Sequence, residues 1–144
     1  YGYDIERASV VRRPTDTLSG SKEVEVAADR GWQSSGLILP AGSYEFSASG
    51  EYLMRTGDEE WPSGPDGISI DWYRGERVGR MMLAIRGGED LASVYTPLLQ
   101  PQPLGTGIRL RIDREGELFL RINDSPASLE DNRGSGKVTI RRLP

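Results

Sequence analysis

A polar stretch near the end of the chain holds most of the residues that could do chemistry. Residues 122–140, INDSPASLEDNRGSGKVTI, contain two aspartates, one glutamate, two asparagines and three serines between two strand-like runs. A reversal between strands needs only about two to five residues, so this loop is longer than a turn requires. Its oxygen atoms suit a hard cation such as Ca²⁺, which takes about six to eight oxygen ligands.

Three side chains in this loop are candidate calcium ligands, namely those of Asp124, Asp131 and Asn132. A backbone carbonyl of Ser128 or of a neighbour can fill the gap between them. The spacing is not that of an EF-hand, because counting from Asp124 places Leu129 where that loop requires glycine. The alternative is a polar loop that is held only by local hydrogen bonds of its Asn and Asp side chains.

Composition excludes several classes of site. Cys and His are both absent from the 144 residues, which removes thiol nucleophiles, disulfides, His-based triads and most zinc and copper sites. The net charge is -4 and the basic residues are dispersed, so nucleic acid and anionic membranes are disfavoured as partners. No apolar run approaches the length of a membrane span. No nucleophile elbow, phosphate loop or metal-hydrolase motif is present, and we predict that the protein is not an enzyme.

Alternation of apolar and polar residues predicts the scaffold that positions the loop. One apolar and one wet face per strand is typical of antiparallel sheets, so the sequence predicts an all-β jelly-roll β-sandwich of about eight or nine strands. Within residues 76–86 a helical stripe also fits, but Gly79 inside this segment and the flanking Gly75 and Gly87 favour a strand. The stripe consists of Val78, Met81, Met82 and Ile85. The segments LPAG (39–42) and DREG (113–116) are interpreted as hairpin-type turns. The alternating runs are Val24/Val26/Ala28, Tyr44/Phe46/Ala48, Ile68/Ile70/Trp72, Ile108/Leu110/Ile112, Leu118/Leu120/Ile122 and Val138/Ile140.

The strand pattern divides the chain into two parts. Residues 1–21 are polar and are interpreted as a leader or linker, in which Val10 and Val11 can add an edge strand. Residues 22–144 form the predicted domain. Trp32 and Trp72 fall in strand patterns and are predicted to lie in its core.

The loop resembles the calcium loop of the bacterial galactophilic, calcium-dependent lectins, whose fold is a galactose-binding-domain-like β-sandwich. The resemblance rests on Asn123-Asp124, Pro126, Asp131-Asn132 and Gly134-Ser135, which fall in step with that loop without a gap. At the level of pattern it extends over residues 22–144.

The resemblance implies a ligand set and a mode of binding. Asp124, Asp131 and Asn132 would bind Ca²⁺ through their side chains, Ser128 through its carbonyl, and a further carbonyl would come from residues 52–55. In that family, two sugar hydroxyls complete the coordination of the ion.

The second loop departs from the family. The family has a His before and a Gln after its Pro-Asp pair, whereas this chain has Gly64-Pro65-Asp66-Gly67. Both sugar-orienting side chains are therefore missing. Pro65 and Asp66 remain candidate ligand contacts, and Asp66 is also explained by an ordinary turn. Trp61 is a candidate for stacking on a sugar or for covering the core, and Tyr52 for flanking the metal loop or packing in its strand.

We therefore predict a calcium-dependent carbohydrate-binding module of a secreted or periplasmic protein. The alternative is a non-catalytic structural or protein-interaction β-sandwich that has lost sugar binding. The resemblance also leaves open a homo-oligomer, and the start of the sequence at Tyr1 rather than Met leaves open a larger parent chain.

Overall fold

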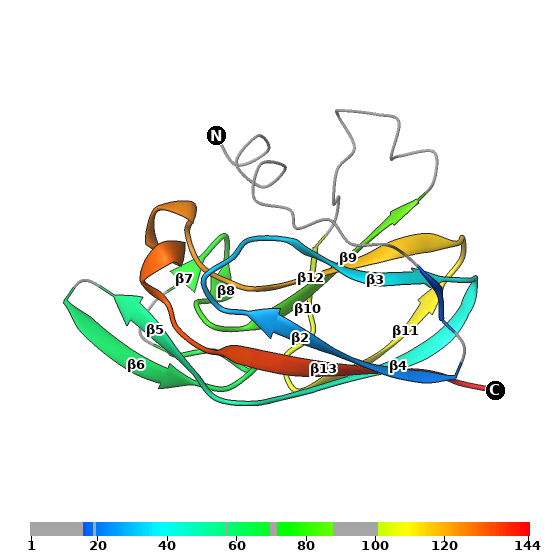
Figure 1. Ribbon diagram of the computed structural model, residues 1–144, viewed down its shortest axis with the longest axis horizontal. Helices are drawn as coiled ribbons and strands as arrows, with labels where there is room; N and C mark the ends of the chain where they lie inside the picture. The colour runs from blue at the N-terminus through cyan, green and yellow to red at the C-terminus, as the bar shows by residue number, and fades with distance from the viewer. Residues whose placement is uncertain (1–15, 19, 57, 70–71, 88–100) are drawn as a thin grey trace.

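Two β-sheets pack face to face to form the protein (Figure 1). The computed structural model describes residues 16–18, 20–56, 58–69, 72–87 and 101–144. The predicted all-β sandwich is confirmed, and its two main sheets hold five and four strands. The five-stranded sheet has the order β1 (Asp16–Thr17), β3 (Gln33–Leu39), β12 (Gly116–Ile122), β9 (Met81–Gly87), β10 (Gln102–Pro103), and the four-stranded sheet β11 (Gly107–Ile112), β4 (Gly42–Ser49), β13 (Ser135–Arg142), β2 (Ser21–Ala27).

The smaller elements gather at one end of the sandwich. Two short hairpins are formed by β5 (Tyr52–Thr56) with β6 (Glu59–Ser63), and by β7 (Trp72–Tyr73) with β8 (Glu76–Arg77). A 3-10 turn, η2 (Pro126–Asp131), lies in the loop between β12 and β13. Figure 1 shows η2, β5 and the β7–β8 hairpin at the same end of the molecule.

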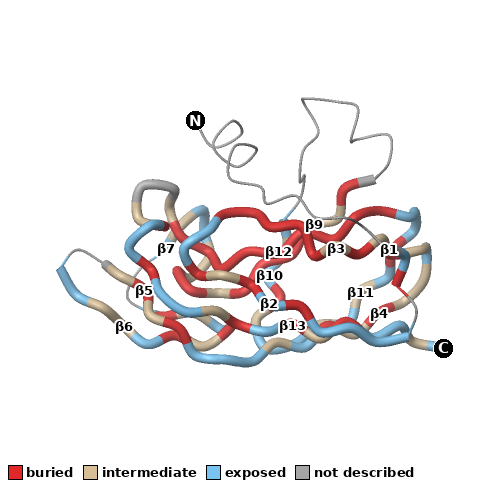
Figure 2. The backbone as a smooth tube through the Cα atoms, in the orientation of Figure 1, coloured by how far each residue is buried: buried red, intermediate tan, exposed pale blue. Residues whose placement is uncertain are grey.

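The core between the sheets follows the predicted alternation in most strands. In β2, β4 and β13 the inward side chains are buried, and most of those that alternate with them are exposed or half-buried. The largest fully buried side chains of this layer include Tyr44, Phe46 and Tyr52. Figure 2 shows this burial along the strands that line the interior.

Strand β12 departs from the alternation, because all seven of its residues are buried. Leu118, Leu120 and Ile122 enter the main core, whereas Phe119 joins a second buried cluster with Trp32, Met82 and Ala84. Since successive strand residues point to opposite faces, this second cluster lies on the outer face of the five-stranded sheet. The prediction that each strand has one solvent-exposed face was therefore wrong for β12.

The two turns interpreted as hairpins are corners between the sheets. Residues 40–41 connect β3 in the five-stranded sheet to β4 in the four-stranded sheet, and residues 113–115 likewise connect β11 to β12. Turn-forming residues predict that the chain reverses, but they do not determine which sheet the next strand joins.

The predicted strands between residues 68 and 87, and the predicted burial of two tryptophans, are confirmed only in part. Residues 81–87 form a strand, which confirms the strand interpretation there, but Gly79 lies in a turn between β8 and β9 rather than inside a strand. The run Ile68/Ile70/Trp72 is not one strand with an inward face: Ile68 is buried, Ile70 lies outside the described residues, and Trp72 is 55% exposed. The prediction that Trp72 lies in the core was wrong, whereas Trp32 is buried.

The N-terminal part of the described chain adds an edge strand. Val10 and Val11 lie outside the described residues, but β1 pairs in parallel with β3, and the Leu18 amide donates to the Ile38 carbonyl at 2.8 Å. A short edge strand therefore precedes residue 22. Within the described part of the chain, no helix is long and apolar enough to cross a membrane.

Gly79 allows the chain to turn between β8 and β9, and it provides a test of this packing. Its φ is +91°, and a Cβ at this position would overlap the Ser63 hydroxyl oxygen. Gly75 has a similar φ of +80° but open space around its Cβ position. Gly79→Ala should therefore lower the free energy of unfolding by about 1–3 kcal/mol more than Gly75→Ala, as overpacking does, in urea denaturation. Equal losses in the two variants would contradict this packing.

Candidate functional site

The polar loop between β12 and β13 is anchored on the β5–β6 hairpin. Leu53 and Arg133 exchange two backbone hydrogen bonds, of 2.8 and 2.9 Å. The loop and residues 52–55 are therefore neighbours, as the family resemblance implied.

Asp124 is buried in this loop, with 3% of its surface exposed. Its Oδ1 accepts a hydrogen bond from the Ser125 amide at 2.7 Å, and its Oδ2 accepts one from the Asn132 side-chain amide at 2.8 Å. Its backbone carbonyl accepts a hydrogen bond of 2.6 Å from the Arg121 guanidinium. Of the predicted metal ligands, the structure thus brings Asp124 and Asn132 into direct contact.

Asn132 joins three segments of the chain. Its Oδ1 accepts a hydrogen bond from the Arg55 amide at 3.0 Å, and its Nδ2 donates to the Ala28 carbonyl at 3.2 Å as well as to Asp124. The residue is 2% exposed. A buried amide whose donors and acceptor are satisfied holds the loop in one conformation, because each of these groups would be costly to leave unpaired.

The other two predicted ligands lie farther toward the surface. Asp131 ends η2 and is exposed. Ser128 is half-buried; its amide donates to the Ser125 carbonyl at 3.0 Å, and the two hydroxyl oxygens are 3.1 Å apart. Among the residues that the structure describes, no three His, Cys, Asp or Glu side chains are grouped so as to hold a metal.

The Asp124–Asn132 pair fits a cation in position and donor type, but not in the orientation of the amide. A buried carboxylate beside an amide offers oxygen ligands of the kind that Ca²⁺ takes. In this structure, however, the Asn132 amide turns its nitrogen toward Asp124. An ion between the two side chains requires the amide to turn over, which would break its hydrogen bonds to Arg55 and Ala28.

The second predicted loop serves mainly to connect elements. Pro65 is buried, and its carbonyl accepts the Met81 amide at 2.8 Å. Asp66 is exposed, and its Oδ1 accepts the Thr106 amide at 3.2 Å. Trp61 is half-buried against the main core.

Tyr52 follows the packing alternative. Its ring is 2% exposed, and its hydroxyl donates to the Gly79 carbonyl at 2.7 Å. Its side chain therefore belongs to the core rather than to the surface of the metal loop.

The β7–β8 hairpin is the part of this region that the sequence pattern did not identify. The Asn123 side chain donates to the carbonyls of Tyr73, Glu76 and Arg77 at 3.1–3.2 Å, which fixes the hairpin beside the polar loop. Trp72 is the one exposed large hydrophobic side chain among the described residues, and the Arg77 guanidinium lies 5.7 Å from its ring centroid. The sequence Tyr-Arg-Gly directly after Trp72 is a turn signal that could have placed this tryptophan on a short hairpin. In the structure, Arg74 in this turn has a positive φ of 53°.

Comparison with solved structures shows a lectin-like fold. The N-terminal domain of EclA, described as a PllA-like lectin, superposes with a TM-score of 0.60 at 21% identity, over 88% of this chain and 98% of that one. PliG of Aeromonas hydrophila, a periplasmic inhibitor of g-type lysozyme, gives a TM-score of 0.49 at 7% identity, over 94% and 98% of the two chains. No family model matches the sequence, and a search of curated proteins finds no match either.

The role of Asn132 can be separated from that of its neighbour by a matched pair of variants. Asn132→Ala removes a buried amide and leaves the Arg55 amide and the Asp124 carboxylate short of a partner, so it should lower the free energy of unfolding by about 2–4 kcal/mol. Asp131→Ala, at an exposed position, should change it by no more than about 0.5 kcal/mol. Urea denaturation measures both. Similar losses would contradict the assignment of Asn132 as the residue that holds the loop.

The buried hydroxyl of Tyr52 predicts a loss of stability at alkaline pH. Burial, with a smaller contribution from the charge of Asp66, raises the pKa of Tyr52 above the usual value of 10.0. The unfolded chain therefore loses this proton first, and the stabilisation, fully present below that usual value, decreases as the pH rises above it. Tyr52→Phe should cost about 1 kcal/mol at neutral pH and should flatten the alkaline decrease, leaving the smaller share of Tyr44, whose pKa burial also raises. Denaturation at several pH values would detect this, and an unchanged slope in the variant would contradict it.

Proposed function

We propose that the protein is a carbohydrate-binding module whose sugar site lies on the polar loop and the β7–β8 hairpin. The observation that carries this proposal is the exposed indole of Trp72 on the β7–β8 hairpin, whose backbone Asn123 bonds to the polar loop, on a lectin-like fold. A non-catalytic role and a site of action outside the cytoplasm, both expected from the resemblance of the loop to the bacterial calcium-dependent lectins, are part of the proposal.

Trp72 has the properties of a sugar-stacking residue. An exposed indole loses apolar contact with water when the apolar face of a pyranose covers it, and aromatic rings contribute large contact areas at low entropic cost. The neighbouring Arg77 guanidinium can donate hydrogen bonds to hydroxyls at the edge of such a ring. Trp72 thereby takes the role that the sequence suggested for Trp61, which packs against the core.

The calcium requirement is the second part of the proposal. Asp124 and Asn132 would form the base of the ion site once the Asn132 amide turns its oxygen toward Asp124, with the Ser128 carbonyl and Asp131 as the remaining ligands that the family resemblance implies. When bound, the ion supplies coordination positions for vicinal sugar hydroxyls, which replace water. The support is the buried carboxylate of Asp124 next to an amide, within a loop whose residue order matches the family motif.

Thermal melting tests the calcium requirement. Saturating the folded state at about a hundred times the Kd stabilises it by about 2.7 kcal/mol, which corresponds to an increase in Tm of roughly 5–10 °C for a domain of this size. We expect this shift when EDTA is replaced by millimolar Ca²⁺. Asp124→Asn, which removes the charge but keeps the shape, should abolish the shift, whereas Asp113→Asn at an exposed corner should retain it.

The absence of a shift in the unmodified protein would contradict the calcium requirement and leave the Asp124–Asn132 pair as a structural contact. Asp131→Asn reports on the implied ligand set, because a reduced shift in that variant identifies Asp131 as a ligand.

A glycan array with and without Ca²⁺ tests sugar binding. We expect binding that depends on Ca²⁺ and is lost in Trp72→Ala, with the fold of that variant verified by its melting curve. Arg111→Ala, on the four-stranded sheet, is the exposed control. The proposed site would be wrong if Trp72→Ala bound glycans as well as the unmodified protein, and the proposed function would be wrong if no glycan bound in either condition.

A further inference from the structure

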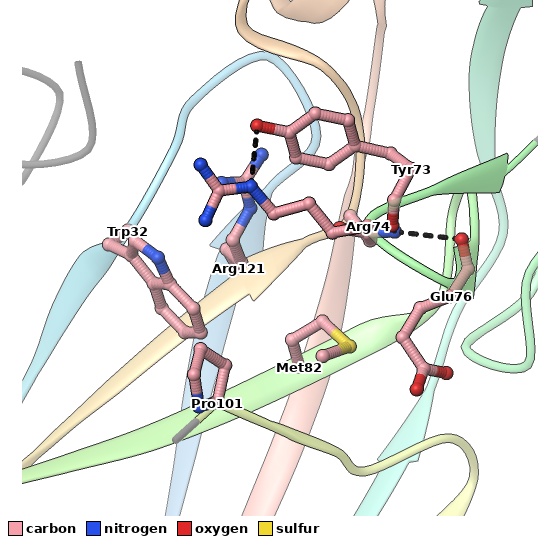
Figure 3. A pocket seen from close by; sticks show the side chains of 8 residues that line it. Trp32, Tyr73, Arg74, Glu76, Met82, Pro101 and Arg121 are labelled. Carbon is pink, nitrogen blue, oxygen red and sulfur yellow. Dashed lines mark hydrogen bonds between the residues drawn. The ribbon is translucent and has the colours of Figure 1, made fainter. Parts of the chain in front are cut away.

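A cavity of about 270 Å³ lies between the β7–β8 hairpin and the outer face of the five-stranded sheet (Figure 3). Its walls include the aromatic rings of Trp32 and Tyr73, the guanidinium groups of Arg74 and Arg121, and apolar surface from Met82 and Pro101. The cavity is separate from the exposed face of Trp72, which is not among its lining residues. Sites for small molecules usually measure about 300–1,000 Å³, so this volume suits a ligand with a single ring.

The indole nitrogen of Trp32 is a buried donor without a partner. Trp32 is 1% exposed, and its Nε1 has no hydrogen-bond acceptor among the described residues. Figure 3 shows this nitrogen on the side of the ring that faces Arg121. Buried polar groups are nearly always paired, so this donor points to an acceptor that a ligand would supply.

The lining is rich in donors and positive charge. The Arg121 guanidinium is buried, and it lies 5.7 Å from the ring centroid of Trp32 and 6.0 Å from that of Tyr73. Arg74 donates from its Nε to the Tyr73 hydroxyl at 3.1 Å, and Figure 3 shows its side chain reaching from the hairpin turn in the direction of Trp32.

One carboxylate, that of Glu76, lines the cavity beside these groups, and it is already paired with Arg80 at 2.9 Å. Guanidinium groups favour planar carboxylates, to which they can donate two parallel hydrogen bonds.

We propose that this cavity binds a monosaccharide-sized ring acid of the hexuronic acid class. The carboxylate lies toward the guanidinium groups, an oxygen of the ligand accepts the Trp32 indole N–H, and the ring packs against Tyr73 and Pro101 in the cavity lining. This site lies beside the calcium loop, which contributes Asn123 to its lining, but its occupancy needs neither the ion nor Trp72.

Indole resonances in ¹H–¹⁵N NMR test this inference directly. The chain has 3 tryptophans, so each indole N–H signal is assigned by one Trp→Phe variant. In EDTA and at low salt, D-glucuronate or D-galacturonate should shift the Trp32 signal in a saturable manner. D-glucose, which lacks the carboxylate, and acetate, which lacks the ring, should leave it in place at the same concentration.

Variants locate the ligand within the cavity. Arg74→Gln should weaken uronate binding about tenfold, because it removes a charge-assisted contact. The matched control Arg111→Gln, at an exposed position on the other sheet, should bind as the unmodified protein does. Trp32→Phe keeps a ring but lacks the donor, and should also weaken binding in calorimetric titration, with its fold verified by its Tm.

Three results would overturn the inference: an unmoved Trp32 signal at millimolar uronate, an equal shift with glucose, or unchanged affinity in both Arg74→Gln and Trp32→Phe. Loss of uronate binding in Trp72→Ala, or dependence on Ca²⁺, would instead place the acid on the calcium loop. That outcome would overturn this site while supporting the proposed function. The reverse outcome, uronate binding in EDTA without any glycan binding in Ca²⁺, would retain this site and reject the loop.

Discussion

The buried side-chain amide of Asn132 is the contact on which the functional end of the molecule depends. It bonds at once to the carboxylate of Asp124, the amide of Arg55 and the carbonyl of Ala28. A loop of this length carries many polar groups that could pair in several ways, and a satisfied buried network selects one of them. Asn132 fixes the positions of η2 and of the β5 edge together with the backbone hydrogen bonds between Leu53 and Arg133.

A second set of contacts places the β7–β8 hairpin beside that loop. Asn123 satisfies three carbonyls of the hairpin, and the Gly79 amide donates to the Asn123 carbonyl at 2.7 Å. The Gly79 carbonyl in turn accepts the hydroxyl of Tyr52 from the core. Trp72 is thus exposed without being loosely placed, because the backbone on which it stands is bonded to both the loop and the core. A fixed backbone beneath the indole would lower the cost of ordering this residue at the proposed site, since ordering mobile groups on binding reduces affinity.

Burial of both faces of β12 creates a second buried cluster, on the outer face of the five-stranded sheet, next to the cavity. The inner residues of this strand fill the main core, while Phe119 and Arg121 face the outer cluster around Trp32. Arg121 joins the two regions, because its guanidinium lies at the cavity and donates to the backbone carbonyl of Asp124. A ligand in the cavity and an ion in the loop would therefore act on opposite ends of one short stretch of chain.

The sequence alone determined the β-sandwich class and the polar loop, because alternation of buried and exposed residues is a local property of each strand. It also predicted Asp124 and Asn132 as candidate ligands through their order in the loop motif, and the structure places these two side chains in contact. Only the tertiary structure decided that 39–42 and 113–116 are corners between sheets, that Trp72 rather than Trp61 is exposed, and that the Asn132 amide turns its nitrogen toward Asp124. These outcomes depend on which distant segments meet: the same tryptophan is core or surface according to the strand opposite it, and the orientation of an amide is set by partners 77 and 104 residues away.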